Sequence, residues 1–277
     1  MNITFLGTGA AEGIPSPFCN CGTCQHAREQ GGRNVRRRQC FLINDDLLLD
    51  VGPDLFASCA QFGISLVELR YMLVTHNHLD HFTPSNLQLR AKPFRLSTEL
   101  PDLAMVAGPS VLATWDLSGG RDSDAGIRRI PFLPGRSVSL SPYKVRSIEA
   151  THNLRIGDAM NYIIDDGRVK ILIASDTGIY DESIWEQLAN EAFDTVIMEA
   201  TLLNHTPGKE HLNLQDFRIM LDRMRQTKVV RENTVIVASH FSHQSVGSHD
   251  ETDRVLAEIG VTCAFDGMKI TVGSHEN

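Results

Sequence analysis

Metal-binding side chains are concentrated in residues 75–81, Thr-His-Asn-His-Leu-Asp-His, directly after an apolar run. Three imidazoles and a carboxylate so close together cannot all be core residues, because burying them unpaired would be costly. Imidazole nitrogens and carboxylate oxygens are instead common ligands of divalent cations. In extended backbone His76 and His78 point the same way, while Asp80 and His81 can turn toward a second ion where the chain leaves the strand. The spacing therefore predicts a metal site.

Three later ligand-type residues repeat this placement. His152 follows the run 145–150, Asp176 follows 169–174 and His240 follows 234–238, each at the end of an apolar, strand-like stretch. Loops at the ends of rigid strands are where proteins usually carry functional groups. Together with residues 75–81 they make four such positions in one chain, and this recurrence predicts a common site.

A second candidate site is rich in thiols. Cys19, Cys21 and Cys24 lie within six residues of a Gly- and Pro-containing segment. Thiols this close either oxidise or bind metal, and a structural zinc needs a fourth ligand. His243 fits that position. The other cysteines are scattered beside apolar stretches, where small core residues are expected: Cys40, Cys59 and Cys263.

The elements that must position these residues are indicated by apolar runs. Strand-like runs occur at 3–6, 40–43, 47–50, 71–74, 104–106, 145–148, 169–174, 195–198, 234–238 and 269–272. Between them, a stripe of apolar residues from Leu214 to Met224 predicts the longest helix, and Val255 to Ile259 predict another. Interleaved strands and helices indicate a layered α/β fold. The Gly- and Asp-containing segment 119–135 is expected to be a long loop or a boundary between two halves.

The amino-acid composition of the chain argues against some classes of function. The chain has 277 residues and a formal charge of −8, from 26 Lys and Arg against 34 Asp and Glu. This balance argues against nucleic acid as a partner, because nucleic-acid binding needs a basic face. No apolar run approaches the roughly 20 residues of a membrane span, so no membrane partner is expected. A secreted disulfide scaffold would be shorter and denser in cysteine, and there is no signal-peptide pattern, so a cytoplasmic protein is predicted.

In this order, the motifs resemble those of the metallo-β-lactamase superfamily. The resemblance implies an αββα sandwich, with residues 1–277 forming one domain of two similar halves that divide near 119–135. It implies that His76, His78 and His152 bind one metal, that Asp80, His81 and His240 bind a second, and that Asp176 bridges them. Asp50, at the end of Leu-Leu-Leu-Asp, would orient a bound histidine or water. The lactamases proper lack the bridging aspartate, and the oxygen-reducing diiron members have an acidic residue at the position of His78, so hydrolysis of another bond is favoured.

Within the superfamily, the sequence resembles more specifically the PhnP-like phosphodiesterases of the carbon–phosphorus lyase pathway. It is carried by the thiol cluster with His243, by Gly7-Thr8-Gly9 with Gly13, and by Phe265-Asp266-Gly267-Met268. His211 aligns with an extra catalytic histidine of that family. PqqB-type proteins share the Cys-rich start but match less well at the C-terminal end.

The resemblance predicts a dinuclear phosphodiesterase that hydrolyses a small phosphodiester, such as a phosphoribosyl cyclic phosphate. Its cofactors would be two divalent cations, Zn or Mn, and one structural zinc. His211 would act as general acid, and Asp50 and Asp80 would complete the catalytic set. A thioester or lactone hydrolase and a PqqB-like accessory protein are the alternatives, and a homodimer stays open.

Some residues have no assigned part in this scheme. Arg33, Arg36, Arg37 and Arg38 are candidates for a phosphate contact or for a solvated loop. Four histidines without a partner pattern are expected at the surface: His26, His205, His249 and His275.

Overall fold

The first of two β-sheets is built mainly from the N-terminal half of the chain. The computed structural model describes residues 1–273, so His275 lies outside the described residues. The strands of this sheet are β1 (Asn2–Gly7), β2 (Cys40–Ile43), β3 (Leu47–Leu49), β4 (Tyr71–Leu73), β5 (Leu103–Ala107), β6 (Ile127–Pro131) and β14 (Lys269–Thr271). Their order is β14-β1-β2-β3-β4-β5-β6, and β3 to β6 pair in parallel.

The second sheet repeats this arrangement with the rest of the chain. Its strands are β7 (Ser137–Leu140), β8 (Tyr143–Glu149), β9 (Met160–Asp165), β10 (Lys170–Ala174), β11 (Phe193–Glu199), β12 (Val230–Ser239) and β13 (Thr262–Cys263). Their order is β13-β12-β11-β10-β9-β8-β7, with parallel pairing from β10 to β13. Each sheet thus has one parallel and one antiparallel part.

Alternation along the strands places apolar side chains on both faces of each sheet. On β10, Ile171 and Ile173 pack in the core between the sheets, whereas Leu172 packs in the outer core against helices. On β4, Leu73 faces the other sheet and Met72 faces outward. Strands that are buried on both faces read as continuous apolar runs, which is why most of them stand out in the sequence.

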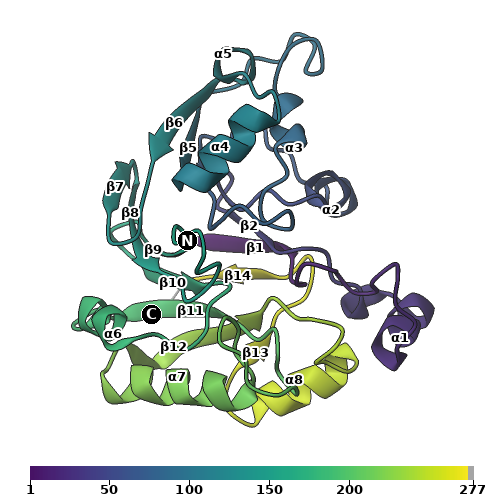
Figure 1. The fold of residues 1–277 in the computed structure, drawn as a ribbon, viewed down its shortest axis with the longest axis vertical. Coiled ribbons are helices and arrows are strands. Elements are labelled where there is room, and N and C mark those ends of the chain that lie inside the picture. The colour runs from purple at the N-terminus through teal and green to yellow at the C-terminus, as the bar shows by residue number, and fades with distance from the viewer. Residues whose placement is uncertain (274–277) are drawn as a thin grey trace.

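Helices cover the two outer faces (Figure 1). The first sheet is covered by α2 (Leu55–Phe62), α3 (Ser85–Gln88), α4 (Pro109–Leu117) and α5 (Asp122–Ala125), and the second by α6 (Glu182–Leu188), α7 (Leu214–Gln226) and α8 (His249–Ala257). At one side of the molecule lies α1 (Gly22–Gln30). The short 3-10 helix η1 (Gly32–Asn34) follows it in the chain. The layers are therefore αββα, and the predicted fold class is confirmed.

One expectation about the chain's organisation is wrong. Segment 119–135, expected to be a long loop or a boundary between two halves, is not a long loop, because it contains both α5 and β6. It does lie next to the point where the chain passes from β6 of the first sheet to β7 of the second. Its Arg and Asp residues are compatible with structure because Arg129 bridges Asp116 and Asp122 at 2.6 and 2.7 Å across the helix–strand junction. Among the described residues, none of the helices has the length and apolar character needed to cross a membrane.

Candidate metal centre

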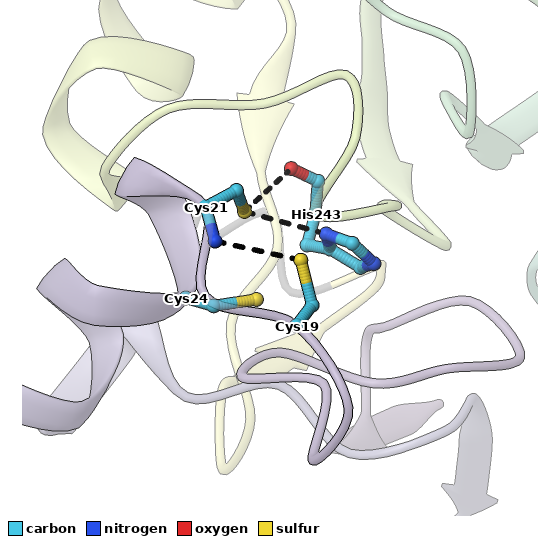
Figure 2. Close-up of side chains that lie close together, drawn as sticks. All are labelled: Cys19, Cys21, Cys24 and His243. Carbon is cyan, nitrogen blue, oxygen red and sulfur yellow. Dashed lines mark hydrogen bonds between the residues drawn. The ribbon is translucent and has the colours of Figure 1, made fainter.

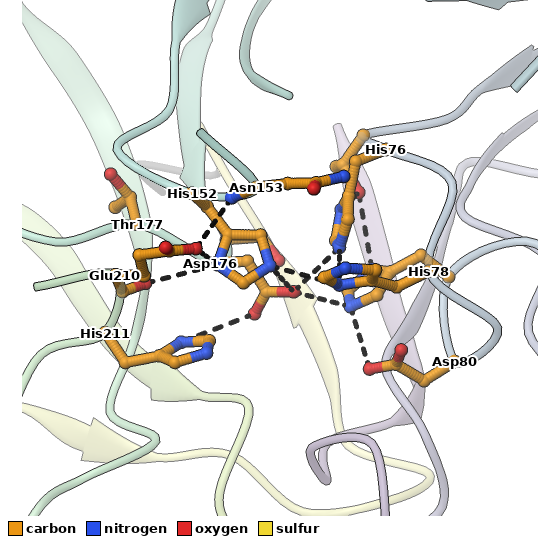
Figure 3. Close-up of polar contacts among 12 residues, drawn as sticks. His76, His78, Asp80, His152, Asn153, Asp176, Thr177, Glu210 and His211 are labelled. Atoms are coloured by element: carbon orange, nitrogen blue, oxygen red, sulfur yellow. Dashed lines mark hydrogen bonds and ion pairs between the residues drawn. The ribbon is translucent and has the colours of Figure 1, made fainter. Parts of the chain in front are cut away.

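The predicted ligands converge because the strands that precede them end at one edge of the sandwich. Residues 76–81 follow β4, Asp176 follows β10 and His240 follows β12. His152 follows β8, which runs parallel to β10 because both are antiparallel to β9. The carboxyl ends of parallel strands meet at the same edge of a sheet, where open α/β sheets bind ligands. Figure 3 shows the side chains of His76, His78, Asp80, His152 and Asp176 gathered there.

Three imidazole nitrogens form the first group. Nδ1 of His78 lies 2.9 Å from Nε2 of His76 and 3.2 Å from Nε2 of His152. His76 and His152 are buried, whereas His78 is exposed and closes the group from the solvent side. One donor atom from each side chain therefore points to a common centre, as ligands of a single cation do.

The second group joins two carboxylates to two imidazoles. Nε2 of His81 lies 3.1 Å from Oδ2 of Asp80 and 2.7 Å from Oδ2 of Asp176. Nε2 of His240 lies 3.0 Å from Oδ1 of Asp176. Oδ2 of Asp176 is also 3.4 Å from Nε2 of His76. The carboxylate of Asp176 thus lies between the two groups, at the position predicted for a bridging ligand.

The polar atoms of the second group have no satisfactory partner within the protein. Nε2 of His81, Oδ1 of Asp176 and Nε2 of His240 are buried without a hydrogen bond among the described residues. Their short mutual distances do not have hydrogen-bond directions, so the atoms crowd around a shared point instead of bonding to one another. Buried polar atoms are rarely left unpaired, and a divalent cation with nitrogen and carboxylate ligands would satisfy all three. The residues present therefore fit a metal ion.

Hydrogen bonds behind the histidines fix which nitrogen faces the centre. Nδ1 of His81 donates to Oδ2 of Asp50 at 2.7 Å, and Nδ1 of His152 donates to the carbonyl of Glu210 at 3.3 Å. The Thr201 hydroxyl donates to the His240 carbonyl at 3.0 Å, so its oxygen accepts from Nδ1 of His240 at 2.8 Å. In each ring Nε2 faces the centre, where a cation could replace its proton, an arrangement typical of metal-binding histidines.

The backbone is held in an uncommon conformation at three of these positions. Asp50, Asp176 and His240 have φ values of 64°, 44° and 60°. Non-glycine residues adopt the left-handed region at a cost, and such residues cluster at functional sites. Each of them lies within two residues of the end of a strand, at the edge where the ligands meet.

Burial and neighbouring charges shift the protonation equilibria of the site. Burial disfavours the charged imidazolium, but Asp176 and Asp80 outweigh it and raise the pKa of His240 to about 10. His81 faces three carboxylates, which raise its pKa well above the ordinary value in spite of burial. His76 has no such excess of carboxylates, and burial with the charge of His81 holds its pKa well below the usual range.

His211 lies at the side of the two groups, just before α7. Its Nδ1 is 2.8 Å from Oε1 of Glu199, which is buried at the end of β11. The Glu199 carboxylate also accepts the backbone N–H groups of Thr177 and Thr201, at 3.1 and 2.8 Å. Burial acts to lower the pKa of His211, but the bond to Glu199 and its charge raise it. The imidazole of His211 is therefore held by Glu199 beside the metal-ligand groups (Figure 3).

Cys19, Cys21, Cys24 and His243 also come together, as predicted (Figure 2). Sγ of Cys21 is 3.5 Å from Nδ1 of His243, and the backbone N–H of Cys21 faces Sγ of Cys19 at 3.5 Å. Burial opposes ionisation of Cys21, but hydrogen bonds from the backbone of Cys24 and from His243 lower its pKa to about 6. A thiolate is the form that binds metal, so the donor set fits a zinc ion.

A cavity of about 330 Å³ opens over the His and Asp groups. Beyond the candidate ligands, its wall includes Glu12, Leu202, His205, Ser242 and Gln244. Among residues 1–273, no arginine contributes to this wall.

Two expectations about basic residues are wrong. Arg36 is buried, and its guanidinium donates to Oγ1 of Thr8 at 2.9 Å and lies 3.2 Å from Nδ1 of His249, so it is neither a phosphate ligand nor solvated. His249 is likewise buried. A guanidinium can be buried here because Thr8, a backbone carbonyl and the ring of Phe241 surround it.

Glu199 was missing from the predicted site. It directly follows the apolar run 195–198, so the rule that singled out the other ligands would have found it. Glu12 had no such signal, because its neighbours at the site come from residues more than 200 positions away.

Comparison with known proteins now gives the family. The family described as "Beta-lactamase superfamily domain" matches residues 46–241, more than half of the chain. The chain belongs to this superfamily. The match contains the two His and Asp groups, Glu199 and His211, and it ends one residue after His240. The family and these groups together support a metal-dependent hydrolase.

Solved structures show the same fold along nearly the whole chain. A diphosphatase of the PhnP family has a TM-score of 0.73 and 20% identity, covering 97% of this chain and 96% of that one. Zn²⁺-bound PqqB from Methylobacterium extorquens has a TM-score of 0.69 and 17% identity, covering 98% and 100%. The short form of human tRNase Z has a TM-score of 0.64 and 20% identity, covering 98% and 99%. At sequence identities this low, the comparison with these structures shows a shared fold.

The curated proteins provide a partial match. A stretch of 85 residues is 32% identical to an octanoyltransferase of Porphyromonas gingivalis (strain ATCC BAA-308 / W83), covering 29% of this chain. The match spans only 16% of the length of that protein.

Proposed function

We propose that this superfamily member is a dinuclear metal-dependent phosphodiesterase that acts on a small phosphodiester. The first cation would be held by His76, His78 and His152. The second would be held by Asp80, His81 and His240, with Asp176 shared between the two. Cys19, Cys21, Cys24 and His243 would hold a structural zinc. Divalent cations in such a pair make water nucleophilic near neutral pH and neutralise charge on a phosphoryl group.

The position of His211 is the observation that favours a phosphodiester over a thioester as the substrate. Cleavage of a phosphodiester expels an alkoxide, which needs a proton, whereas a thiolate of ordinary pKa about 8.5 leaves without one. Nδ1 of His211 is bonded to Glu199, so the protonated ring can deliver the proton on Nε2 to the leaving oxygen. Glu199 is itself fixed by two backbone N–H groups, and it keeps the ring in place while the charge changes.

The protein around the cavity supports a small substrate. A volume of about 330 Å³ accommodates a sugar phosphate or a mononucleotide. Because none of the described residues that line its wall is an arginine, the cations would be the main source of positive charge for the phosphate. Cyclic phosphates, phosphoribosyl cyclic phosphate among them, are therefore the substrates that we favour.

The test is hydrolysis by Mn- or Zn-loaded protein of a panel with linear and cyclic phosphodiesters, a thioester, a lactone and a lactam. We expect diester cleavage that is abolished in Asp176→Asn and retained in Asp158→Asn. The second variant also alters a buried carboxylate, but one that accepts bonds from Ser110 at 2.7 and 2.8 Å. Thioester or lactone cleavage without diester cleavage would overturn the proposal, and no turnover of any substrate would favour an accessory protein.

A further inference from the structure

The two metal-ligand groups are joined by a short segment of chain. His240 belongs to the His and Asp group, and His243, three residues later, belongs to the thiol group. Between them, the ring of Phe241 is fully buried against the guanidinium of Arg36, which lies 4.4 Å from the ring centroid. The segment that links the two groups is therefore anchored in the protein interior at Phe241.

Glu12 lies where this segment meets the cavity. The Ser242 hydroxyl donates to Oε1 of Glu12, and the same oxygen is 3.6 Å from Nε2 of His243. The other ring nitrogen of His243 faces Sγ of Cys21 at 3.5 Å. His243 thus has the thiols on one side and a carboxylate on the other, which is how outer carboxylates orient metal-binding histidines.

The backbone holds Glu12 close to this partner. The N–H of Ala10 donates to the carbonyl of Phe241 at 2.9 Å, and the N–H of Phe241 donates to the carbonyl of Thr8, also at 2.9 Å. Glu12 follows on a turn closed by the bond from the N–H of Gly13 to Ala10 at 2.9 Å. Its side chain is about one quarter exposed and lines the cavity.

We propose that Glu12 couples the two metal-ligand groups. A cation held by the three cysteines and His243 fixes the His243 ring, and His243 with Ser242 then holds the Glu12 carboxylate against the cavity wall. Without that cation the carboxylate is released into the cavity, where its charge opposes a bound phosphate. The zinc of the thiol group therefore sets how tightly the cavity binds an anion. This inference rests on the proposed function, because it takes the cavity as the substrate site.

The first test measures the binding of inorganic phosphate by calorimetry, with Mn²⁺ in the His and Asp groups and zinc in the thiol group. Wild type, Cys19→Ser, Glu12→Gln and the double variant are compared after metal analysis. We expect Cys19→Ser to weaken phosphate binding about tenfold, at the lower end of what outer partners of a metal site contribute. In the Glu12→Gln background the same change should have no effect, because no carboxylate is left to be released. Equal effects of Cys19→Ser in both backgrounds would overturn the proposal.

The second test uses the reciprocity of coupled sites. Saturating phosphate should slow the release of zinc from the thiol group to a chromogenic chelator in wild type, but not in Glu12→Gln. This measurement uses no cysteine variant, so it tests the coupling even if Cys19→Ser does not fold. Zinc release that phosphate leaves unchanged in wild type, or no phosphate binding by wild type, would overturn the coupling. Diester turnover plays no part in either measurement, so a coupled protein that does not cleave diesters would refute the proposed function alone.

Discussion

A substitution of Asp50 tests most sharply whether hydrogen bonds to the candidate metal ligands hold the site together. Its carboxylate is fully buried; Oδ1 accepts the N–H and hydroxyl of Thr75 at 2.8 and 3.0 Å, and Oδ2 accepts Nδ1–H of His81 at 2.7 Å. Asp50→Asn keeps the shape of the side chain and the bonds to Thr75. It places an amide N–H₂ against Nδ1–H of His81, however, so a donor meets a donor and His81 loses its orienting acceptor.

The expected loss of metal affinity follows from the hydrogen bond between Asp50 and His81 that Asp50→Asn removes. A hydrogen bond to a charged group contributes about 1.5–3 kcal/mol, and outer partners of metal ligands contribute about 10- to 100-fold in metal affinity. We therefore expect the dissociation constant of the cation to rise about 10- to 100-fold. The metal-free protein should lose less stability than the loaded one, because burial raises the pKa of Asp50 and a neutral amide avoids that burial cost.

The assay is competition for Mn²⁺ or Zn²⁺ with a chromogenic chelator, together with thermal unfolding of loaded and metal-free protein. Asp158→Asn is the matched control, since it alters a buried carboxylate whose hydrogen bonds are to Ser110 and not to a histidine. Wild-type metal affinity in Asp50→Asn, or an equal loss in both variants, would refute the reasoning.

Three further predictions concern single residues. His211→Ala should lower kcat about 10²- to 10⁴-fold, the usual contribution of a general acid, with unchanged metal content by elemental analysis; loss of metal would show instead that His211 is a ligand. Cys21→Ser should release the zinc of the thiol group and lower Tm, and retained Tm with full activity would contradict a structural role. The pKa of His240, raised to about 10 from an ordinary 6.5, means that a cation must displace its proton at neutral pH. Cation binding should therefore release protons and tighten as pH rises toward 10, which calorimetry in buffers of different ionisation enthalpy measures. The attraction between protonated His240 and the carboxylates of Asp176 and Asp80 stabilises the metal-free protein fully below about pH 6.5, and this stabilisation is lost as the pH rises through about 10. A metal-free protein whose Tm does not change with pH over this range would contradict this prediction.

Much of the site could be predicted because its residues obey a local rule. Each candidate ligand of the His and Asp groups follows a strand, and strands buried on both faces appear in the sequence as apolar runs such as 169–174. The ends of parallel strands meet at one edge, so local spacing was enough to anticipate a convergence that is distant in sequence. The resemblance then supplied the assignment of ligands to two groups.

Other features depend on contacts that local spacing does not encode. In β6, Arg128 and Arg129 interrupt the apolar pattern because this strand lies at the edge of its sheet. Helix α1 buries only Cys24 and Ala27 and therefore shows no apolar stripe. The burial of Arg36 and the position of Glu12 arise from neighbours that the fold brings from the other end of the chain.

The most direct test of the central claim is a metal titration of activity. Protein that keeps zinc in the thiol group and has no metal in the His and Asp groups would be titrated with Mn²⁺ while hydrolysis of bis(p-nitrophenyl) phosphate is followed. Two adjoining ligand groups that share Asp176 predict that full activity requires two equivalents of Mn²⁺, and that Asp176→Asn stays inactive throughout. Full activity at one equivalent, or diester cleavage without added metal, would contradict the dinuclear account.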